Sequence, residues 1–441
     1  MNQSPGANPV SHIPTELTQK RIFLLWLPLA AMWLFMAIEQ PGINAVIARL
    51  ANAKQNLAAY GVTLSISLII EAPIIQMLSA ATALTDGRRN YLKLLRFMHF
   101  MAAGLTAVHV ILALTPLYTL LLRNVLGVPE EIIGPAHSSF IIMIPWAGTI
   151  GYRRLYQGIL IRYGRTKEIS YTMVIRLAVT LGTLFLGHAL TDLAGANLGA
   201  VALIAGVTAG MTAAYMFARP AVRSLQVEAP NKQFNWTYLL TFYYPLLLTS
   251  LITFLARPIL NYGIAHAAFP LESLAVWPVV LSVMFLFRSL ALSFQEVAVA
   301  LLKEAGHVAP LRRFARRLSL GTGLLFFVFV FAPTGRLWFK HVAGLEPDLL
   351  SFTMIPALIV TLVPVLGAFL SWYRGLLIYA GKTKYIAQAV ALNTATLTAM
   401  VIFLPRIVGL SGVIIAALAF TLSQFFEIAY LFYQSRRLQV G

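Results

Sequence analysis

Long apolar runs alternate with short polar connections along the whole chain. A helix needs about 20 apolar residues to cross the hydrocarbon core of a bilayer. Runs of about this length occupy residues 22–48, 57–82, 94–118, 136–160, 170–190, 197–218, 237–262, 273–300, 318–334, 350–372, 384–404 and 409–433. The pattern predicts an all-α polytopic membrane protein with twelve transmembrane helices. The first run continues past the length of a signal-peptide core and lacks a small-residue cleavage site, so we interpret it as the first helix.

The second half of the chain repeats the first. When the sequence is shifted against itself by 217 positions without a gap, residues of the same type coincide from the first expected helix to the fifth. The coincident residues are largely prolines, glycines and polar residues, among them Pro28 and Pro245, Pro41 and Pro258, Asn44 and Asn261, Gly104 and Gly321, Pro116 and Pro333, and Gly127 and Gly344. A single offset kept over about 140 residues indicates a structural repeat and not merely a shared apolar composition.

Each half holds six expected helices, and an even number makes the two halves run in the same direction. Repeats of this kind are related by a pseudo-two-fold axis along the membrane normal. We expect a cytoplasmic tail over residues 1–20, an N-terminal lobe over 21–218, a polar cytoplasmic linker over 219–236 and a C-terminal lobe over 237–441.

The composition supports a membrane protein that is not an enzyme. Hydrophobic residues make up 59% and charged residues 11% of the chain, whereas soluble domains carry roughly 45–50% apolar and 25% charged residues. The chain has no cysteine, which excludes disulfides, thiolate metal sites and a cysteine nucleophile. Its eight histidines lack metal-ligand spacing, and it has no phosphate-binding glycine-rich loop. We therefore expect no metal site, no cofactor and no nucleotide hydrolysis, with H+ or Na+ as the coupling ion.

Topology explains the net charge of +18, and we infer no nucleic-acid partner from it. Of the 33 Lys and Arg residues, 24 lie on or near the side of the N-terminus and six lie on the other side. Because basic residues are retained in the cytoplasm during insertion, we expect an inner-membrane protein with both termini cytoplasmic. We further expect it to be a monomer whose partners are the lipid bilayer and a small-molecule substrate.

Ionisable residues inside a membrane cost roughly 2.5–3.5 kcal/mol each and are the first candidates for function. Glu39 lies in the first expected helix and is followed by Gln40, Pro41 and Asn44. Proline frees backbone carbonyls, and a carboxylate beside freed carbonyls can bind a proton or a sodium ion. We interpret Glu39 as an ion-coupling residue, with Gln40 and Asn44 as substrate contacts beside it. The alternative is an acid that only anchors the outer end of the helix near the lipid headgroups.

The repeat places Arg257 over Gln40 and Asn261 over Asn44, so the seventh helix carries a cation where the first carries an amide. A guanidinium presents five donors in a fork that fits a carboxylate or a phosphate. Arg257 and Asn261 are therefore candidate contacts for an anionic substrate. The alternative is an ion pair between Arg257 and Glu39 that ties the two lobes together.

Two further charges fall on equivalent positions of the two halves. Glu71 in the second helix lies over Arg288 in the eighth. Opposite charges on facing lobes can form a salt bridge that opens when a substrate or a proton competes, which makes Glu71 an ion-coupling candidate and Arg288 a substrate contact. The alternative is that each points toward its own helix neighbours. Arg176 in the fifth helix can likewise contact an anion or extend to the cytoplasmic surface, as can Arg153-Arg154.

Several segments resemble known transporters. Glu39-Gln40, followed by Ala48 and by Leu57-Ala58-Ala59-Tyr60-Gly61, together with Arg257-Pro258-Ile259-Leu260-Asn261, resembles the progressive ankylosis family and its bacterial relatives. The loops Gly164-Arg165-Thr166-Lys167 and Gly381-Lys382-Thr383-Lys384 are similar to those of the wider multidrug/oligosaccharidyl-lipid/polysaccharide (MOP) exporter superfamily. That superfamily includes the multidrug and toxin extrusion (MATE) transporters.

The resemblance implies two six-helix lobes around a V-shaped central cavity that work by alternating access. The ankylosis branch exports anions such as citrate, nucleoside triphosphate and pyrophosphate. The toxin-extrusion branch exchanges cationic or neutral drugs for protons or sodium through an acid in the first helix. Glu39 matches the acid of both branches, and Arg257 matches the arginine of the first branch. Glu71 and Arg288 have no counterpart in either pattern.

A rival fold is the major facilitator architecture, because Asp86-Gly87-Arg88-Arg89 approximates its loop motif. We favour a secondary-active exporter of a small organic anion or polyphosphate such as citrate or pyrophosphate. Three intramembrane arginines, Arg176, Arg257 and Arg288, outnumber two mid-span acids, which tilts the substrate toward an anion. The alternatives are a proton- or sodium-coupled antiporter of cationic drugs and a lipid-linked flippase.

Overall fold

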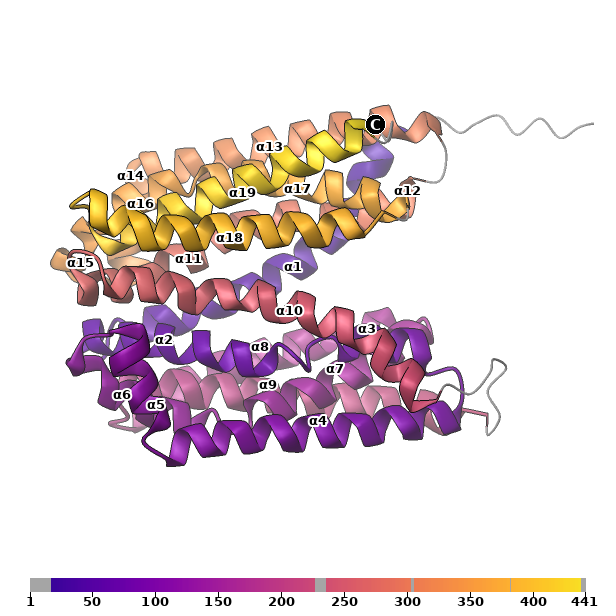
Figure 1. Ribbon diagram of the computed structural model, residues 1–441, viewed down its shortest axis with the longest axis horizontal. Helices are drawn as coiled ribbons and strands as arrows, with labels where there is room; N and C mark the ends of the chain where they lie inside the picture. Colours follow the sequence, from indigo (N-terminus) through magenta and orange to yellow (C-terminus); the bar gives the residue numbers. More distant parts are fainter. Residues whose placement is uncertain (1–16, 227–234, 303–304, 381, 438–441) are drawn as a thin grey trace, which may run out of the picture.

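The computed structural model describes residues 17–226, 235–302, 305–380 and 382–437, and helices account for most of this part of the chain (Figure 1). The helices of the N-terminal half are α1 (Gln19–Ile47), α2 (Ala53–Glu71), α3 (Met77–Leu84), α4 (Arg88–Leu114), α5 (Leu117–Leu120), α6 (Glu130–Ile142), α7 (Trp146–Arg162), α8 (Thr166–Leu190) and α9 (Gly195–Arg223), with a π-helix at Leu121–Leu126.

The C-terminal half begins after the connection between Arg223 and Trp236. Its helices are α10 (Trp236–Ala265), α11 (Pro270–Leu292), α12 (Phe294–Leu301), α13 (Val308–Phe331), α14 (Pro333–Leu337), α15 (Pro347–Ser351), α16 (Met354–Ile359), α17 (Leu362–Tyr379), α18 (Lys384–Ile407) and α19 (Gly412–Arg437), with a 3-10 turn at Ala305–His307 and a π-helix at Trp338–Val342.

The offset of 217 found in the sequence is also the offset between the two halves of the structure. Both halves carry a short π-helix at the equivalent place, Leu121–Leu126 and Trp338–Val342. The unusual backbone angles recur as well, because Asn52 and Phe269 have φ of 54° and 55°. A non-glycine residue in this left-handed region is uncommon, so two at equivalent positions mark the same turn built twice. The predicted repeat is therefore confirmed as two lobes related by a pseudo-two-fold axis.

Ten helices of the described residues are long and apolar enough to cross a membrane, compared with the twelve expected. The two remaining runs, expected at 57–82 and 136–160, are each divided by a turn, at residues 72–76 between α2 and α3 and at 143–145 between α6 and α7. Pro73 and Pro145 lie in these turns. Proline has no N–H to continue the helical ladder, which favours a break at these two places.

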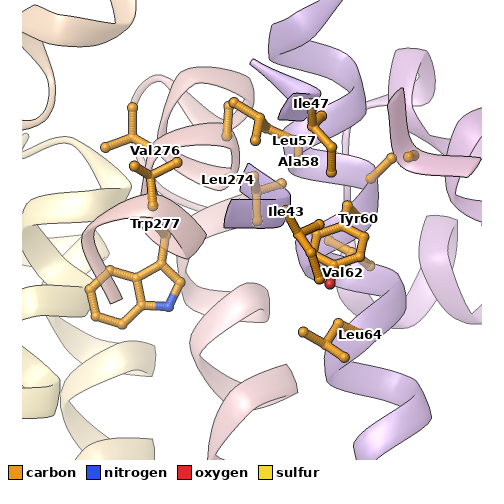
Figure 2. Packing of buried hydrophobic residues seen from close by; sticks show 14 of the residues in the cluster. Ile43, Ile47, Leu57, Ala58, Tyr60, Val62, Leu64, Leu274, Val276 and Trp277 are labelled. Carbon is orange, nitrogen blue, oxygen red and sulfur yellow. The ribbon is translucent and has the colours of Figure 1, made fainter. Parts of the chain in front are cut away.

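The lobes pack together at one end of the molecule and separately at the other. We call the end where α1 begins and α19 ends the terminal end, and the opposite end, where α1 ends and α2 begins, the loop end. One cluster of buried apolar residues joins both lobes at the loop end, where Leu274 of α11 lies beside Ile43 of α1 (Figure 2). At the terminal end the core divides into separate clusters, one for the N-terminal lobe and two for the C-terminal lobe.

The first helix of each half crosses from one lobe to the other. The start of α1 packs on the C-terminal lobe, where the Trp26 indole Nε1–H donates to the Leu290 carbonyl at 3.1 Å. The start of α10 packs on the N-terminal lobe, where the Tyr243 hydroxyl donates to the Pro73 carbonyl at 2.7 Å. These two bonds are equivalent under the offset of 217. Figure 1 shows α10 crossing obliquely between the lobes, and α1 makes the equivalent crossing.

Candidate functional site

The Glu39 carboxylate lies in α1 and is held by two residues of α8. The Arg176 guanidinium binds both carboxylate oxygens, with Nε donating to Oε1 at 2.9 Å and Nη2 donating to Oε2. The Thr180 hydroxyl donates to Oε1 at 2.9 Å. A bidentate pair of this kind is strong and fixes the geometry of both side chains. Glu39 is therefore paired within its own lobe, and the alternative ion pair with Arg257 is not formed.

Small residues of α9 allow this arrangement. Gly206 and Gly210 are four residues apart, and the backbone of α8 passes directly over them. A Cβ atom at Gly206 would lie 1.9 Å from Thr180 Oγ1, and one at Gly210 would lie 3.3 Å from Arg176 Cβ. Glycines at this spacing let transmembrane helices approach closely. The close approach of α8 to α9 positions Arg176 and Thr180 against α1.

A second group of charges lies deeper in the N-terminal lobe. Arg153 and Glu71 are 2% and 3% exposed. Arg154, the next residue of α7, is half-buried. The charges that act most strongly on the Glu71 carboxyl are Arg154, then Arg153, then Arg176. Nε of both Arg153 and Arg154 and Oε2 of Glu71 are buried without a hydrogen-bond partner. Arg153 therefore faces the interior and does not extend to the membrane surface.

The C-terminal lobe holds its own charges, and they do not include Glu71. The Arg374 guanidinium in α17 donates to Glu427 in α19. The Arg288 guanidinium in α11 lies 5.6 Å from the centre of the Phe420 ring, and the opposite charge that acts on it is that of Glu427. Glu71 and Arg288 form no salt bridge in this conformation, and each faces charges of its own lobe, which is the second of the two alternatives left open by the sequence.

The candidate amides lie where the two lobes meet at the loop end. The Asn44 side-chain amide donates to the Pro278 carbonyl at 3.1 Å and to the Ser282 hydroxyl at 3.3 Å. The equivalent amide of Asn261 donates to the Ser65 hydroxyl at 2.8 Å. Both amides thus reach from the first helix of one lobe to the second helix of the other lobe. Their donors hold the lobes together in this conformation.

The remaining two candidates lie beside this contact. The Gln40 carbonyl oxygen accepts a hydrogen bond from the Tyr60 hydroxyl at 3.2 Å. Arg257 is half-buried on α10, one turn before Asn261, and forms no ion pair with a described carboxylate. Glu71 is the described carboxylate that acts on Arg257, and the Tyr60 hydroxyl lies near it. Arg257 therefore interacts with the charged residues of the N-terminal lobe, although it lies on α10.

The charged residues inside the two lobes form an N-terminal group and a C-terminal group, and both groups have an excess of positive charge. Arg153, Arg154, Arg176 and Arg257 face Glu39 and Glu71 in the N-terminal group. Arg288 and Arg374 face Glu427 in the C-terminal group. Six arginines thus stand against three carboxylates.

Sequence reasoning missed two members of the C-terminal group. These are Arg374 in α17 and Glu427 in α19. The structure joins them across α17 and α19. One signal was available, because the repeat places Arg374 over Gln157, which is buried in α7.

No family model matches the chain, and no curated protein matches it in sequence. Solved structures match it in fold. An inward-facing multidrug-resistance MATE transporter of the MOP superfamily has a TM-score of 0.69 and 15% identity, over 94% of this chain and 98% of that one. The lipid II flippase MurJ in an inward closed conformation has a TM-score of 0.69 and 13% identity, over 94% of this chain and 87% of that one.

A third similar structure is a MOP superfamily transporter from Pyrococcus furiosus, described as having a binding pocket of reverse polarity. Its TM-score is 0.62 at 16% identity, over 97% of this chain and 98% of that one. The chain therefore has the fold of MOP superfamily transporters, as the resemblance implied, and not the major facilitator fold. The narrower resemblance to the progressive ankylosis family stays a prediction.

Proposed function

We propose that the chain is an alternating-access secondary transporter that carries a small organic anion or a polyphosphate, such as citrate or pyrophosphate, across the inner membrane. The main support is a set of arginines in both lobes whose buried Nε–H groups have no acceptor among the described residues: Arg153, Arg154, Arg288 and Arg374. A buried donor without an acceptor is costly, and a carboxylate or phosphate would satisfy it. A cationic drug would instead meet a net positive charge.

The conformation fits a transporter that is open on one side. Most Lys and Arg residues lie toward the terminal end, so we assign that end to the cytoplasm. The lobes share one core at the loop end and have separate cores at the terminal end. This corresponds to an inward-facing state in which the arginines are reached from the cytoplasm. Opening to the other side requires the loop-end contacts of Asn44 and Asn261 to break.

Glu39 is the group that couples transport to a cation. In this conformation its carboxylate accepts hydrogen bonds from the Arg176 guanidinium and from the Thr180 hydroxyl, so Arg176 is not free to bind the substrate. Protonation of Glu39 removes the negative charge and frees Arg176 as a further contact for the anion. A sodium ion that neutralises Glu39 has the same effect. Which of the two ions couples transport depends on the size of the space beside Glu39 and on the oxygen ligands that line it. A cavity of about 70 Å³ lies next to Glu39 and Arg176.

The structural neighbours support transport in general terms. Their titles describe multidrug resistance for one, flipping of lipid II for another and a pocket of reverse polarity for the third. Proteins of this fold thus differ in the polarity of what they bind. The positive balance of the buried charges here favours the anion over the cationic drug.

The test is equilibrium binding to the purified protein, with labelled citrate, pyrophosphate and a lipophilic cation as probes. Removing one charged hydrogen-bond donor costs about 1.5–3 kcal/mol, so Arg154→Gln is expected to weaken binding of the anion by about tenfold or more. Arg88→Gln is the matched control, because Arg88 is exposed at the start of α4. Binding of the cation without the anions would refute the proposal. Binding of neither soluble probe, but of a lipid-linked pyrophosphate, would favour a flippase.

A further inference from the structure

A membrane-facing groove lies between the start of α1 and the first half of α13. Its volume is about 540 Å³. Lys20 and Arg317 line it toward the terminal end, and Trp26, Phe314 and Leu325 supply much of its apolar wall. Lys20, Arg317 and Leu325 are exposed. From Lys20 and Arg317 toward the middle of the helices the wall of the groove is uncharged as far as Leu325, so a charged part adjoins an apolar part, as in a phospholipid.

A second pocket, of about 410 Å³, adjoins the groove on the neighbouring face of α13. Four exposed arginines line it, Arg312, Arg313, Arg316 and Arg317, and Arg317 lines both spaces. Among the residues that the structure describes, no carboxylate lines either space. None of these arginines forms an ion pair with a carboxylate of the described part of the chain. Within the described part of the chain, the positive charge of this cluster is therefore uncompensated.

The internal repeat provides a comparison within the molecule. The positions of α4 equivalent to the four arginines of α13 are Leu95, Arg96, His99 and Phe100. A general preference for basic residues on the cytoplasmic side acts on both lobes equally. Both lobes carry four basic residues near the start of this helix, because α4 has Arg88, Arg89, Lys93 and Arg96, so the preference explains their number. It does not explain their register, which on α13 places all four arginines along one pocket and Arg317 also in the groove.

We propose that one anionic glycerophospholipid binds here, with its phosphate on Lys20 and Arg317 and an acyl chain along the groove. Basic pockets between transmembrane helices at the cytoplasmic side recognise anionic headgroups, and arginine matches a phosphate in a bidentate manner. Arg313 and Arg316, on the same helix, are available to a second phosphate, so a lipid with two phosphates, such as cardiolipin, binds more tightly than one with a single phosphate.

This lipid stabilises the conformation described above. The start of α1 is fastened to the C-terminal lobe by two hydrogen bonds, from Gln19 Nε2 to the Pro310 carbonyl at 2.8 Å and from Trp26 to Leu290. A phosphate bridging Lys20 of α1 and Arg317 of α13 adds to this attachment. A ligand shifts a conformational equilibrium toward the state that it binds better. Anionic lipid therefore favours the state in which α1 lies on α13.

The experiment measures lipid retained on the full-length protein by native mass spectrometry, after incubation with cardiolipin, phosphatidylglycerol or phosphatidylcholine. Each basic residue near an anionic headgroup contributes about 1 kcal/mol, which is about fivefold in affinity. Lys20→Gln/Arg317→Gln is therefore expected to weaken cardiolipin binding about 25-fold. Arg88→Gln/Arg89→Gln removes the same charge from exposed positions of α4 and is expected to leave binding unchanged.

Three results would overturn the lipid site. They are equal retention of phosphatidylcholine and cardiolipin, equal losses in the two double variants, and full displacement of cardiolipin by glycerol phosphate alone, which would indicate a site for free phosphate. If Lys20→Gln/Arg317→Gln does not fold, Arg316→Gln/Arg317→Gln leaves α1 intact and is expected to weaken cardiolipin binding about as much. None of these measurements depends on the transported substrate.

Discussion

A methyl group added at Gly61 is expected to push the two lobes apart at the loop end. Gly61 of α2 and Pro278 of α11 are equivalent under the repeat and touch each other across the pseudo-two-fold axis. A Cβ atom at Gly61 would lie 2.5 Å from Pro278 Cγ and 3.6 Å from its Cβ and Cδ. The first distance is too short for two carbon atoms. The proline ring is rigid, so the strain is relieved by moving one helix away from the other.

The size of the effect follows from the cost of overpacking. An extra carbon in a well-packed contact costs about 1–3 kcal/mol. This cost falls only on the conformation in which α2 touches α11. A free energy of 1.4 kcal/mol is a factor of ten in an equilibrium constant, so Gly61→Ala is expected to shift the population by about 5- to 150-fold toward a state open at the loop end.

Double electron–electron resonance measures this shift. The chain has no native cysteine, so spin labels attach only at the introduced pair Ala51→Cys and Ala268→Cys. Both positions are exposed and equivalent under the repeat. Gly61→Ala is expected to add a population at longer distance between the labels.

Gly104→Ala is the matched control. A Cβ atom at Gly104 in α4 would meet nothing within 4 Å, and it gains the same helix propensity from the exchange. Its distance distribution is expected to equal that of the unmodified chain. If the folded Gly61→Ala protein gave that distribution too, the contact between Gly61 and Pro278 would not hold the loop end closed.

Two further predictions concern ion pairs. Removing one partner of a buried pair costs about 3–5 kcal/mol, so Glu39→Gln and Arg176→Gln are each expected to lower stability by about that amount and the double variant by clearly less than their sum. A double-mutant cycle on thermal unfolding measures this, and additive effects would contradict the pair. At the loop end the Arg123 guanidinium holds the pKa of Glu130 below its usual value, so the pair contributes above the ordinary pKa and is lost as pH falls through the lowered one. Arg123→Gln is expected to return the Glu130 pKa to its ordinary range in an NMR titration of labelled glutamate, and an unchanged titration would show that Arg123 is not the cause.

The sequence predicts the two-lobe architecture well because prolines and glycines record it. Their positions are tied to breaks and close contacts, which both halves share, while the apolar residues between them are interchangeable. The breaks themselves were not predicted. Pro41 and Pro258 lie inside continuous helices, whereas Pro73 and Pro145 lie in turns. The packing of neighbouring helices decides which prolines stay inside a continuous helix and which end it. A single sequence does not show that packing.

The sequence indicated which charged residues lie inside the lobes, but it did not indicate which residues they contact. The expectation that equivalent residues face each other holds only close to the symmetry axis, where Gly61 meets Pro278. Farther from the axis, as at Glu71 and Arg288, each residue faces its own lobe. The partner of Glu39 depends on the rotation of α8, which is set by Gly206 on α9. Three helices determine that one contact, and spacing along the chain does not reveal it.

Counterflow in proteoliposomes tests most directly whether this protein carries an anion through its buried arginines. Vesicles loaded with unlabelled pyrophosphate or citrate are diluted into labelled solute, and a labelled lipophilic cation is tested in the same way. We expect the unmodified chain to accumulate a labelled anion and Arg257→Ala to lose this exchange, with Arg88→Gln unaffected. Exchange of the cation that survives Arg257→Ala but fails in Glu39→Gln would contradict the account and indicate a cation antiporter.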